Sequence, residues 1–274
     1  IGSSTGNMIL KNDDNISLLL KKAKIPVVVH AEHDGIIKEN IERLKNKNIE
    51  PDFYLHHIIR NRDACFSASE KIINIAKKYN TQLHLAHIST IDEIKLLESN
   101  QNNKSITSET CPHYLYFDNS YYETLKGFIK CNPSIKTLCD KEALINAVAN
   151  NIINTIASDH APHRLEEKKS PYKKCPSGIS SIQYSLISVL QLTKRYPSIT
   201  INKIVNLMSH TPASIFKISK RGYIKKGYYA DLVIIKQKKH KILQGNNLSK
   251  SKWSIFDNYE FDFYIDKTII NGKI

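Results

Sequence analysis

No apolar run in the chain approaches the ~18 residues that a membrane-spanning helix needs, so we expect no transmembrane segment. The first residues carry no signal-peptide pattern, and we therefore expect a cytoplasmic protein. The chain also lacks an initiator methionine. It opens at Ile1 and continues with residues 2–6, whose Gly-Ser-Ser-Thr-Gly sequence has the composition of a loop. A start inside a loop predicts a fragment or a processed product.

Cysteine is scarce, and its spacing excludes the usual cysteine-based metal sites. The five cysteines are odd in number and form no CxxC pair and no zinc-finger spacing. We therefore expect reduced thiols, as is usual in the cytoplasm. The five are Cys65, Cys111, Cys131, Cys139 and Cys175.

Arginine is rare for a chain with a formal net charge of +14 and a pI near 9.4. It occurs at only six positions, and the lysines are scattered over the whole chain. Nucleic-acid-binding proteins cluster their positive charge on one face, commonly with arginine. The pattern here argues against a nucleic-acid partner, although it mildly favours small anionic substrates.

The 274 residues, 41% of them hydrophobic, are enough for one large domain or two modest ones. Short apolar, β-branched runs alternate with segments of helical periodicity, an order that predicts a parallel α/β fold. The predicted strands are 25–29, 81–86, 105–110 and 152–157. The predicted helices are 16–24, 36–48, 62–79, 90–100, 140–150, 179–192, 201–209 and 212–218, with loops at 51–61 and from 111 to 139.

The composition changes near residue 220, where glycine-punctuated β structure replaces the helices. We therefore predict that residues 1–219 belong to the α/β part and residues 220–274 to a small β subdomain.

Each predicted strand ends at a residue that can bind a metal: His30, His87, His113 and Asp159. In a β/α barrel the C-terminal ends of the strands build the active site. Two neutral imidazoles and a carboxylate, from His30, His87 and Asp159, suit Zn²⁺ or a similar divalent ion. Such an ion lowers the pKa of bound water to about 7, and Asp159 could take the proton and pass it to a leaving nitrogen.

Other polar residues near these strand ends have two interpretations each. Asn132 could simply make a turn before Pro133, or its amide could hold a substrate carboxylate or imide. His163 could cap its loop or donate to a substrate anion. Lys130 could contact an anion, but a solvated lysine is the simpler interpretation. His113 stands in a Pro-His-Tyr turn and could contact a metal ligand without binding the metal itself. We predict structural or surface roles for the remaining histidines, His33, His56, His57, His84, His160, His210 and His240.

A series of motifs resembles the class I dihydroorotases of the amidohydrolase superfamily. Each motif is moderately specific, and their order and spacing from Gly2 to Gly272 make the series strongly specific. Allantoinases and hydantoinases share the signature around residue 159 only in part. The motifs are 30–32 (His-Ala-Glu), 85–90 (Leu-Ala-His-Ile-Ser-Thr), 107–113 (Thr-Ser-Glu-Thr-Cys-Pro-His), 130–133 (Lys-Cys-Asn-Pro), 159–163 (Asp-His-Ala-Pro-His), 166–168 (Glu-Glu-Lys) and 227–233 (Gly-Tyr-Tyr-Ala-Asp-Leu-Val).

The resemblance implies an amidohydrolase-type (β/α)8 TIM barrel with a small β subdomain and a zinc centre. It implies reversible cyclisation of N-carbamoyl-L-aspartate to L-dihydroorotate in de novo pyrimidine (UMP) biosynthesis. By motif matching, His30 and His87 correspond to metal ligands, and Asp159 corresponds to a ligand that doubles as general acid and base.

The same matching implies the substrate contacts. Asn132 and His163 correspond to substrate-binding positions. Pro176, Ser177 and Gly178 resemble the segment whose backbone contacts the pyrimidine ring.

Parts of the family pattern are not found after Ile1. The pattern starts with a His-x-His pair and includes a bridging carboxylate, and residues 2–6 resemble the segment just after that bridge. His33 stands where the family usually has an acid, a smaller departure. We therefore expect strands five to eight of the barrel only, part of the β subdomain, and one or two zinc ions with further ligands upstream. A half barrel exposes strand edges, so we expect catalysis to need the missing half, in the intact protein or as a separate chain.

Two alternatives stay open. One is a sibling cyclic amidohydrolase that acts on allantoin or a hydantoin. The other is a non-catalytic dihydroorotase-like subunit that scaffolds a partner such as aspartate transcarbamoylase. We also expect a homo-oligomer, a small-molecule substrate, and neither a nucleic acid nor a membrane as partner.

Overall fold

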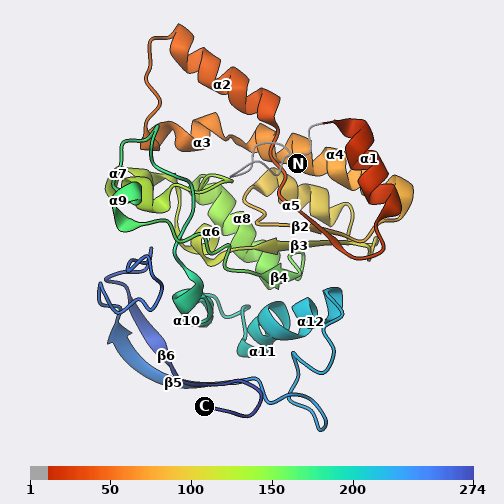
Figure 1. The fold of residues 1–274 in the computed structure, drawn as a ribbon, viewed down its shortest axis with the longest axis vertical. Helices are drawn as coiled ribbons and strands as arrows, with labels where there is room; N and C mark the ends of the chain where they lie inside the picture. Colours follow the sequence, from red (N-terminus) through yellow and green to blue (C-terminus); the bar gives the residue numbers. More distant parts are fainter. Residues whose placement is uncertain (1–11) are drawn as a thin grey trace.

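The computed structural model describes residues 12–274, so the loop-like residues 2–6 lie outside the described part. Its centre is a four-stranded parallel sheet in the order β1-β2-β3-β4 (Figure 1). Val28 pairs with His84, and His84 with Thr107. All four predicted strands are confirmed, although each is shorter than expected. They are β1 (Val27–Val29), β2 (Leu83–Leu85), β3 (Ile106–Thr110) and β4 (Thr155–Ile156).

Helices connect these strands, and their ends follow capping rules. The Thr90 hydroxyl accepts from the Glu93 backbone N–H at 3.1 Å, and the Glu93 carboxylate accepts from the Thr90 hydroxyl at 3.0 Å. The helix that begins at Arg62 ends before Asn80, whose positive φ of 51° stops it. These helices are α1 (Asp13–Lys22), α2 (Asp34–Asn46), α4 (Arg62–Tyr79), α5 (Ile91–Glu98) and α8 (Leu138–Ala149).

The sequential strand order is that of a β/α barrel, because a doubly wound sheet reverses its order at a switch point. Within residues 12–274 the sheet is open, with β1 and β4 as its outer strands. Val28 on β1 is 52% exposed, as expected for an edge. The parallel α/β class is confirmed, and the assignment to strands five to eight of a closed barrel stays a prediction.

Two segments predicted as loops contain short helices. Residues 51–61 form η1 (Phe53–Leu55) and α3 (His56–Ile59). The prediction of loop was wrong here because Asp52 caps the first turn with its carboxylate, which accepts from the Phe53 backbone N–H. The second segment, from residue 111 onward, forms α6 (Pro112–Tyr116), η2 (Asn119–Tyr121), α7 (Tyr122–Leu125) and η3 (Lys126–Ile129), with Pro112 in the first turn of α6, where it is tolerated.

The helix predicted over 179–192 is shorter than expected. Ile179 instead pairs with His160 in a β-bridge, and the Ser181 backbone N–H donates to His160 Nδ1 at 3.1 Å, so the backbone there serves the loop after β4. Regular helix is confined to α10 (Ser185–Gln191), between η4 (Ile182–Tyr184) and η5 (Leu192–Lys194). The helix predicted over 201–209 divides into α11 (Ile201–Val205) and a π-helical turn, η6 (Asn206–His210), before α12 (Thr211–Ile215).

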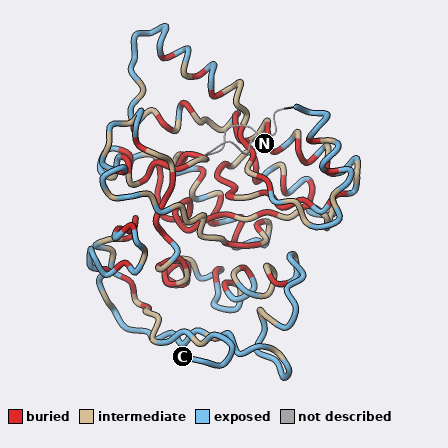
Figure 2. The backbone as a smooth tube through the Cα atoms, viewed as in Figure 1, coloured by how far each residue is buried: buried red, intermediate tan, exposed pale blue. Residues whose placement is uncertain are grey.

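The C-terminal residues form an antiparallel hairpin of β5 (Leu232–Lys241) and β6 (Glu260–Ile269). Helices α10, α11 and α12 lie between this hairpin and the parallel sheet (Figure 1). Most of β5 is exposed (Figure 2), whereas Ile255, Phe256 and Phe261 belong to the same hydrophobic core as the parallel sheet. The predicted division at residue 220 therefore separates two sheets that share a core.

All five cysteines are unpaired, which agrees with the expected reduced thiols. Within residues 12–274, no helix combines the length and the apolar character needed to traverse a bilayer.

Candidate active site

The two predicted histidine ligands meet at the C-terminal edge of the sheet. His30 directly follows β1, and His87 follows β2, the neighbouring strand. Their Nδ1 and Nε2 atoms, respectively, lie 2.9 Å apart, with the rings nearly perpendicular. Adjacent parallel strands end on the same edge of a sheet, so this meeting follows from the strand order. The structure thus brings together two imidazoles that lie 57 residues apart in the chain.

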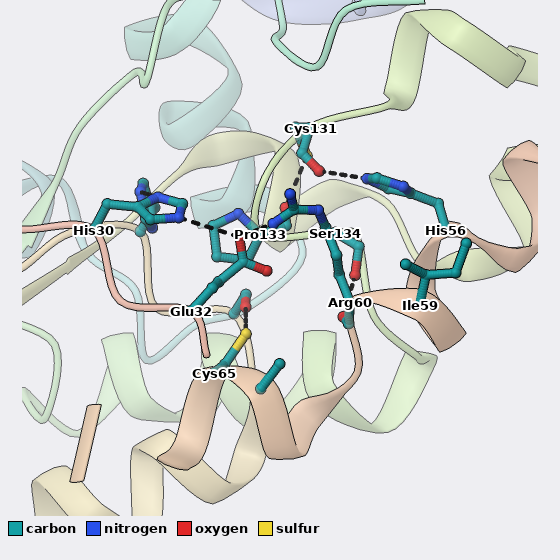
Figure 3. Close-up of polar contacts among 12 residues, drawn as sticks. His30, Glu32, His56, Ile59, Arg60, Cys65, Cys131, Pro133 and Ser134 are labelled. Atoms are coloured by element: carbon teal, nitrogen blue, oxygen red, sulfur yellow. Dashed lines mark hydrogen bonds and ion pairs between the residues drawn. The ribbon is translucent and has the colours of Figure 1, made fainter. Parts of the chain in front are cut away.

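A buried ion pair of Glu32 and Arg60 fixes the orientation of His30 (Figure 3). The other nitrogen of His30, Nε2, donates to Glu32 Oε2 at 3.1 Å. Glu32 is fully buried, and the same oxygen accepts from Arg60 Nη1 at 2.5 Å. Since Glu32 holds the Nε2 proton, the lone pair of a neutral His30 is on Nδ1, which faces His87. Carboxylates behind a histidine commonly orient it in this way toward a metal.

Asp159 lies three residues beyond β4, at the same edge of the sheet. Both Asp159 and His87 have a φ of +44°, a backbone region that residues other than glycine rarely adopt. Strained backbone of this kind persists where the surrounding structure enforces it, commonly at functional sites. The two candidate ligands therefore share an unusual conformation at equivalent places in the fold.

Asp159 influences the pKa values of two neighbouring groups, His87 and Cys131. Burial and then the neighbouring His30 lower the pKa of His87 to about 4, while Asp159 acts against them. The His87 imidazole is therefore neutral at pH 7, the form that binds a metal. Burial raises the pKa of the Cys131 thiol to about 12, and Asp159 adds to that rise. Asp159 is thus near enough to both His87 and Cys131 to influence them.

The histidine pair fits two positions of a metal site. Two nitrogens bound to one tetrahedral zinc ion at about 2.1 Å lie about 3.4 Å apart, so the 2.9 Å pair would need to open by about half an ångström to bind one ion. A complete group of three histidine, cysteine, aspartate or glutamate side chains able to hold a metal is not found in the described part of the chain. Two of the three predicted ligands therefore meet, and Asp159 stands nearby without completing the set.

Asn132 stands in a loop that a second histidine holds in place. His56 is buried, and its Nε2–H donates to the Cys131 carbonyl at 2.9 Å while its Nδ1 accepts from the Tyr172 hydroxyl at 2.9 Å. Burial and then Arg60 lower the pKa of His56 to about 3, so the ring is neutral. Asn132 Oδ1 is buried and accepts no hydrogen bond from residues 12–274. A buried amide oxygen without a partner is available to a ligand.

The other predicted substrate residues lie together. His163 Nε2 donates to the Ser177 carbonyl at 3.0 Å, and the Gly178 backbone N–H donates to the Lys130 carbonyl at 2.9 Å. The loop 176–178 therefore lies between His163 and the stretch that precedes Asn132. Gly178 has a φ of +151°, and a Cβ there would come within 2.7 Å of Ala161, so only glycine fits.

Lys130 corrects one expectation from the sequence. It is 8% exposed rather than solvated, and its Nζ donates to the Tyr172 and Cys175 carbonyls at 2.8 and 2.6 Å. Its ammonium also lies 4.2 Å from the centre of the Tyr172 ring. Its role is therefore internal, toward the loop that follows Asp159.

Sequence reasoning missed Glu32, Arg60 and His56 as members of the site. Glu32 carried a signal, because it stands two residues after His30 in the first motif. Arg60 and His56 carried none, since they stand in a segment predicted as a loop. Their partners Glu32 and Cys131 lie 28 and 75 residues away in the chain.

The Glu32–Arg60 pair predicts a pH dependence of stability. Burial raises the pKa of Glu32, but Arg60 and His30 outweigh it and lower the value from 4.5 to about 2. A lowered carboxyl pKa contributes stability that is fully present above pH 4.5 and is lost as the pH falls toward 2. This shift corresponds to roughly 3 kcal/mol. We expect the stability difference between the wild type and Glu32→Gln, measured by urea unfolding, to shrink between pH 6 and pH 3.

The exposed substitution Glu70→Gln is the control, because it removes a carboxylate with no buried partner. A difference between the wild type and Glu32→Gln that stays constant from pH 6 to pH 3 would contradict the assigned role of the ion pair.

Comparisons with known proteins show which protein family the chain resembles. Residues 12–274 match the model of the amidohydrolase family. The chain is 31% identical over 266 residues to the dihydroorotase of Methanosphaera stadtmanae, which covers 96% of this chain and 61% of that protein. It is 30% identical over 265 residues to the dihydroorotase of Caldicellulosiruptor saccharolyticus, with 95% and 60% covered. An L-hydantoinase (dihydropyrimidinase) structure from Arthrobacter aurescens matches with a TM-score of 0.93 at 21% identity, over 99% of this chain and 62% of that one.

The chain thus spans about 60% of the length of these relatives. The structural match shows a shared fold with the hydantoinase, and the family model covers nearly every residue of the sequence. The order of motifs that resembled an amidohydrolase, the sequential parallel strands and the match to the family model agree. This chain belongs to the amidohydrolase family.

Proposed function

We propose that this chain carries the catalytic metal site of a dihydroorotase, the enzyme that interconverts N-carbamoyl-L-aspartate and L-dihydroorotate. The observation that carries the proposal is the meeting of His30 Nδ1 and His87 Nε2 at 2.9 Å, at the ends of adjacent strands. The identity of about 30% to two dihydroorotases over nearly the whole chain supports this substrate.

In the proposed site, His30 and His87 would hold a zinc ion, with Asp159 as a third ligand. When bound, zinc polarises a carbonyl oxygen and lowers the pKa of water to about 7. The Asp159 carboxylate takes the proton of the attacking water and delivers it to the ring nitrogen that leaves when the amide opens. In the reverse direction the same carboxylate removes the proton from the ureido nitrogen as the ring closes.

Groups other than the three proposed metal ligands recognise the substrate. The free Oδ1 of Asn132 accepts an N–H of the ring imide. Since the Nε2–H of His163 is used by the Ser177 carbonyl, His163 would donate to the substrate carboxylate through a protonated Nδ1. The backbone of Pro176, Ser177 and Gly178 contacts the ring. The lysine-rich composition favours such an anionic substrate.

The test compares three cyclic amides on the zinc-loaded chain. We expect calorimetry to detect L-dihydroorotate binding at least about tenfold tighter than binding of allantoin or hydantoin, because only dihydroorotate offers a carboxylate to His163. Tighter binding of allantoin or hydantoin would overturn the assignment. Turnover of each compound by the same preparation is the second measurement, and full dihydroorotase activity would refute our expectation that catalysis needs a further part of the barrel.

The partners follow from the same proposal. They are a complementary segment of the barrel, a second copy of the chain, and a subunit such as aspartate transcarbamoylase. Size-exclusion chromatography with light scattering on the zinc-loaded chain checks the second of these directly.

A further inference from the structure

Lys168 is a buried cation whose ammonium group donates hydrogen bonds to backbone carbonyls. It is the last residue of α9 (Leu165–Lys168) and is 1% exposed. Its Nζ donates to the carbonyls of Lys130, Pro176 and Gly178 at 3.1, 3.0 and 2.7 Å. All three donors of the ammonium are therefore used. Two of these carbonyls belong to the candidate substrate loop 176–178, and the third lies two residues before Asn132.

We propose that Lys168 is the positioning residue of the substrate side of this site, which holds the loop 176–178 and His163 in place beside Asn132. The statement that the loop 176–178 binds substrate rests on the proposed function. The hydrogen bonds from Lys168 to the loop do not depend on that function.

A second lysine reinforces the first. Lys130 donates to the Tyr172 and Cys175 carbonyls, which lie at the start of the same loop. Within residues 12–274, neither lysine forms an ion pair with a carboxylate. Two ammonium groups therefore hold residues 172–178 through four carbonyl oxygens, and Lys168 joins them to the Lys130 carbonyl. No neutral side chain can replace Lys168, because none offers three donors at one atom.

The packing around Lys168 carries the restraint to His163. The Lys168 ammonium lies 5.7 Å from the centre of the Trp253 ring, and the Trp253 indole N–H donates to the His163 carbonyl at 2.8 Å. A Cβ on Gly127 would come 2.0 Å from the Lys168 carbonyl, so the backbones there touch. Lys168 and Trp253 therefore restrain His163 and the loop 176–178 together, and no contact of Lys168 with His30 or His87 is found in residues 12–274.

Burial lowers the pKa of Lys168 from 10.5 to about 8. The ammonium form with its three donors is therefore the main form at pH 7.

Lys168→Met separates this role from general stability, because methionine keeps the length of the side chain and removes all three donors. We expect hydrogen exchange of backbone amides in 129–132 and 172–178 to become roughly tenfold faster, with no change in α4 or β2. We also expect L-dihydroorotate to bind about tenfold more weakly, while the zinc content stays at that of the wild type. Lys169→Met is the matched control, since Lys169 is the exposed neighbour.

The outcomes are distinct. Faster exchange confined to 129–132 and 172–178 supports the proposal, even where the wild-type chain binds no dihydroorotate and the proposed function fails. Unchanged exchange in that loop, or an equal rise in all peptides, overturns it. If Lys168→Met does not fold, Lys130→Met tests the same point, because it removes two bonds to the same loop and is expected to raise exchange in 172–178 by a smaller factor.

Discussion

Replacing Asp159 by asparagine is expected to lower kcat for the opening of L-dihydroorotate by at least about a thousandfold. An asparagine amide has nearly the same shape but cannot accept the proton of the attacking water or deliver it to the ring nitrogen, and proton transfer of this kind contributes about 10²–10⁴-fold. It is also a weaker metal ligand than a carboxylate. The backbone at this position has a φ of +44°, which asparagine tolerates well, so the fold is expected to survive.

The measurement is kcat with the remaining part of the barrel supplied, in the intact protein or as a separate chain, together with zinc content and the urea midpoint for the same preparation. Asp63→Asn provides a control, because Asp63 is an exposed carboxylate in the first turn of α4. Activity within tenfold of the wild type in Asp159→Asn would show that the general acid and base is another group. Loss of kcat with unchanged zinc content would assign the effect to proton transfer rather than to the metal.

Replacing Arg60 by methionine is expected to destabilise the chain by about 3–5 kcal/mol, since it leaves the fully buried Glu32 carboxylate without its cation. The double variant Arg60→Met with Glu32→Gln is expected to recover a large part of this loss, because it removes the buried charge as well. We also expect zinc to bind the single variant roughly 10–100-fold more weakly, since Glu32 no longer holds His30 in one orientation.

Urea unfolding at pH 7 and zinc titration of the three proteins check these expectations. The control is Arg43→Met, because Arg43 is exposed on α2 and its loss uncovers no buried charge. A double variant as unstable as Arg60→Met alone would mean that Arg60 acts through packing rather than through its charge.

Local sequence patterns were sufficient for most of the regular elements. Helix α4 has the bounds predicted from its periodicity. The alternation of strand and helix also predicted which residues would reach the functional edge of the sheet. His30 and His87 were placed correctly relative to each other because each follows a strand, and a strand end is a local feature.

Contacts between distant segments decided what the local pattern could not. Residues 51–61 looked like a loop, yet they supply His56 and Arg60, whose partners come from other parts of the chain. Lys130 looked like a surface lysine because its own neighbours in sequence do not show that residues 172–175 cover it. The start of the predicted helix at 179 was lost to a β-bridge with His160, a partner 19 residues away in the sequence.

The sequence by itself determined the fold class, the edge of the sheet that carries the candidate site and the residues that end each strand there. Periodicity and strand-end position are properties of neighbouring residues, so they can be read along the chain. Only the tertiary structure decided how those residues are held: the Glu32–Arg60 pair behind His30, the positive φ shared by His87 and Asp159, and the bonds from Lys168 to the loop 176–178. The physical reason is that a buried charge or a strained backbone is stable only when groups from remote segments surround it.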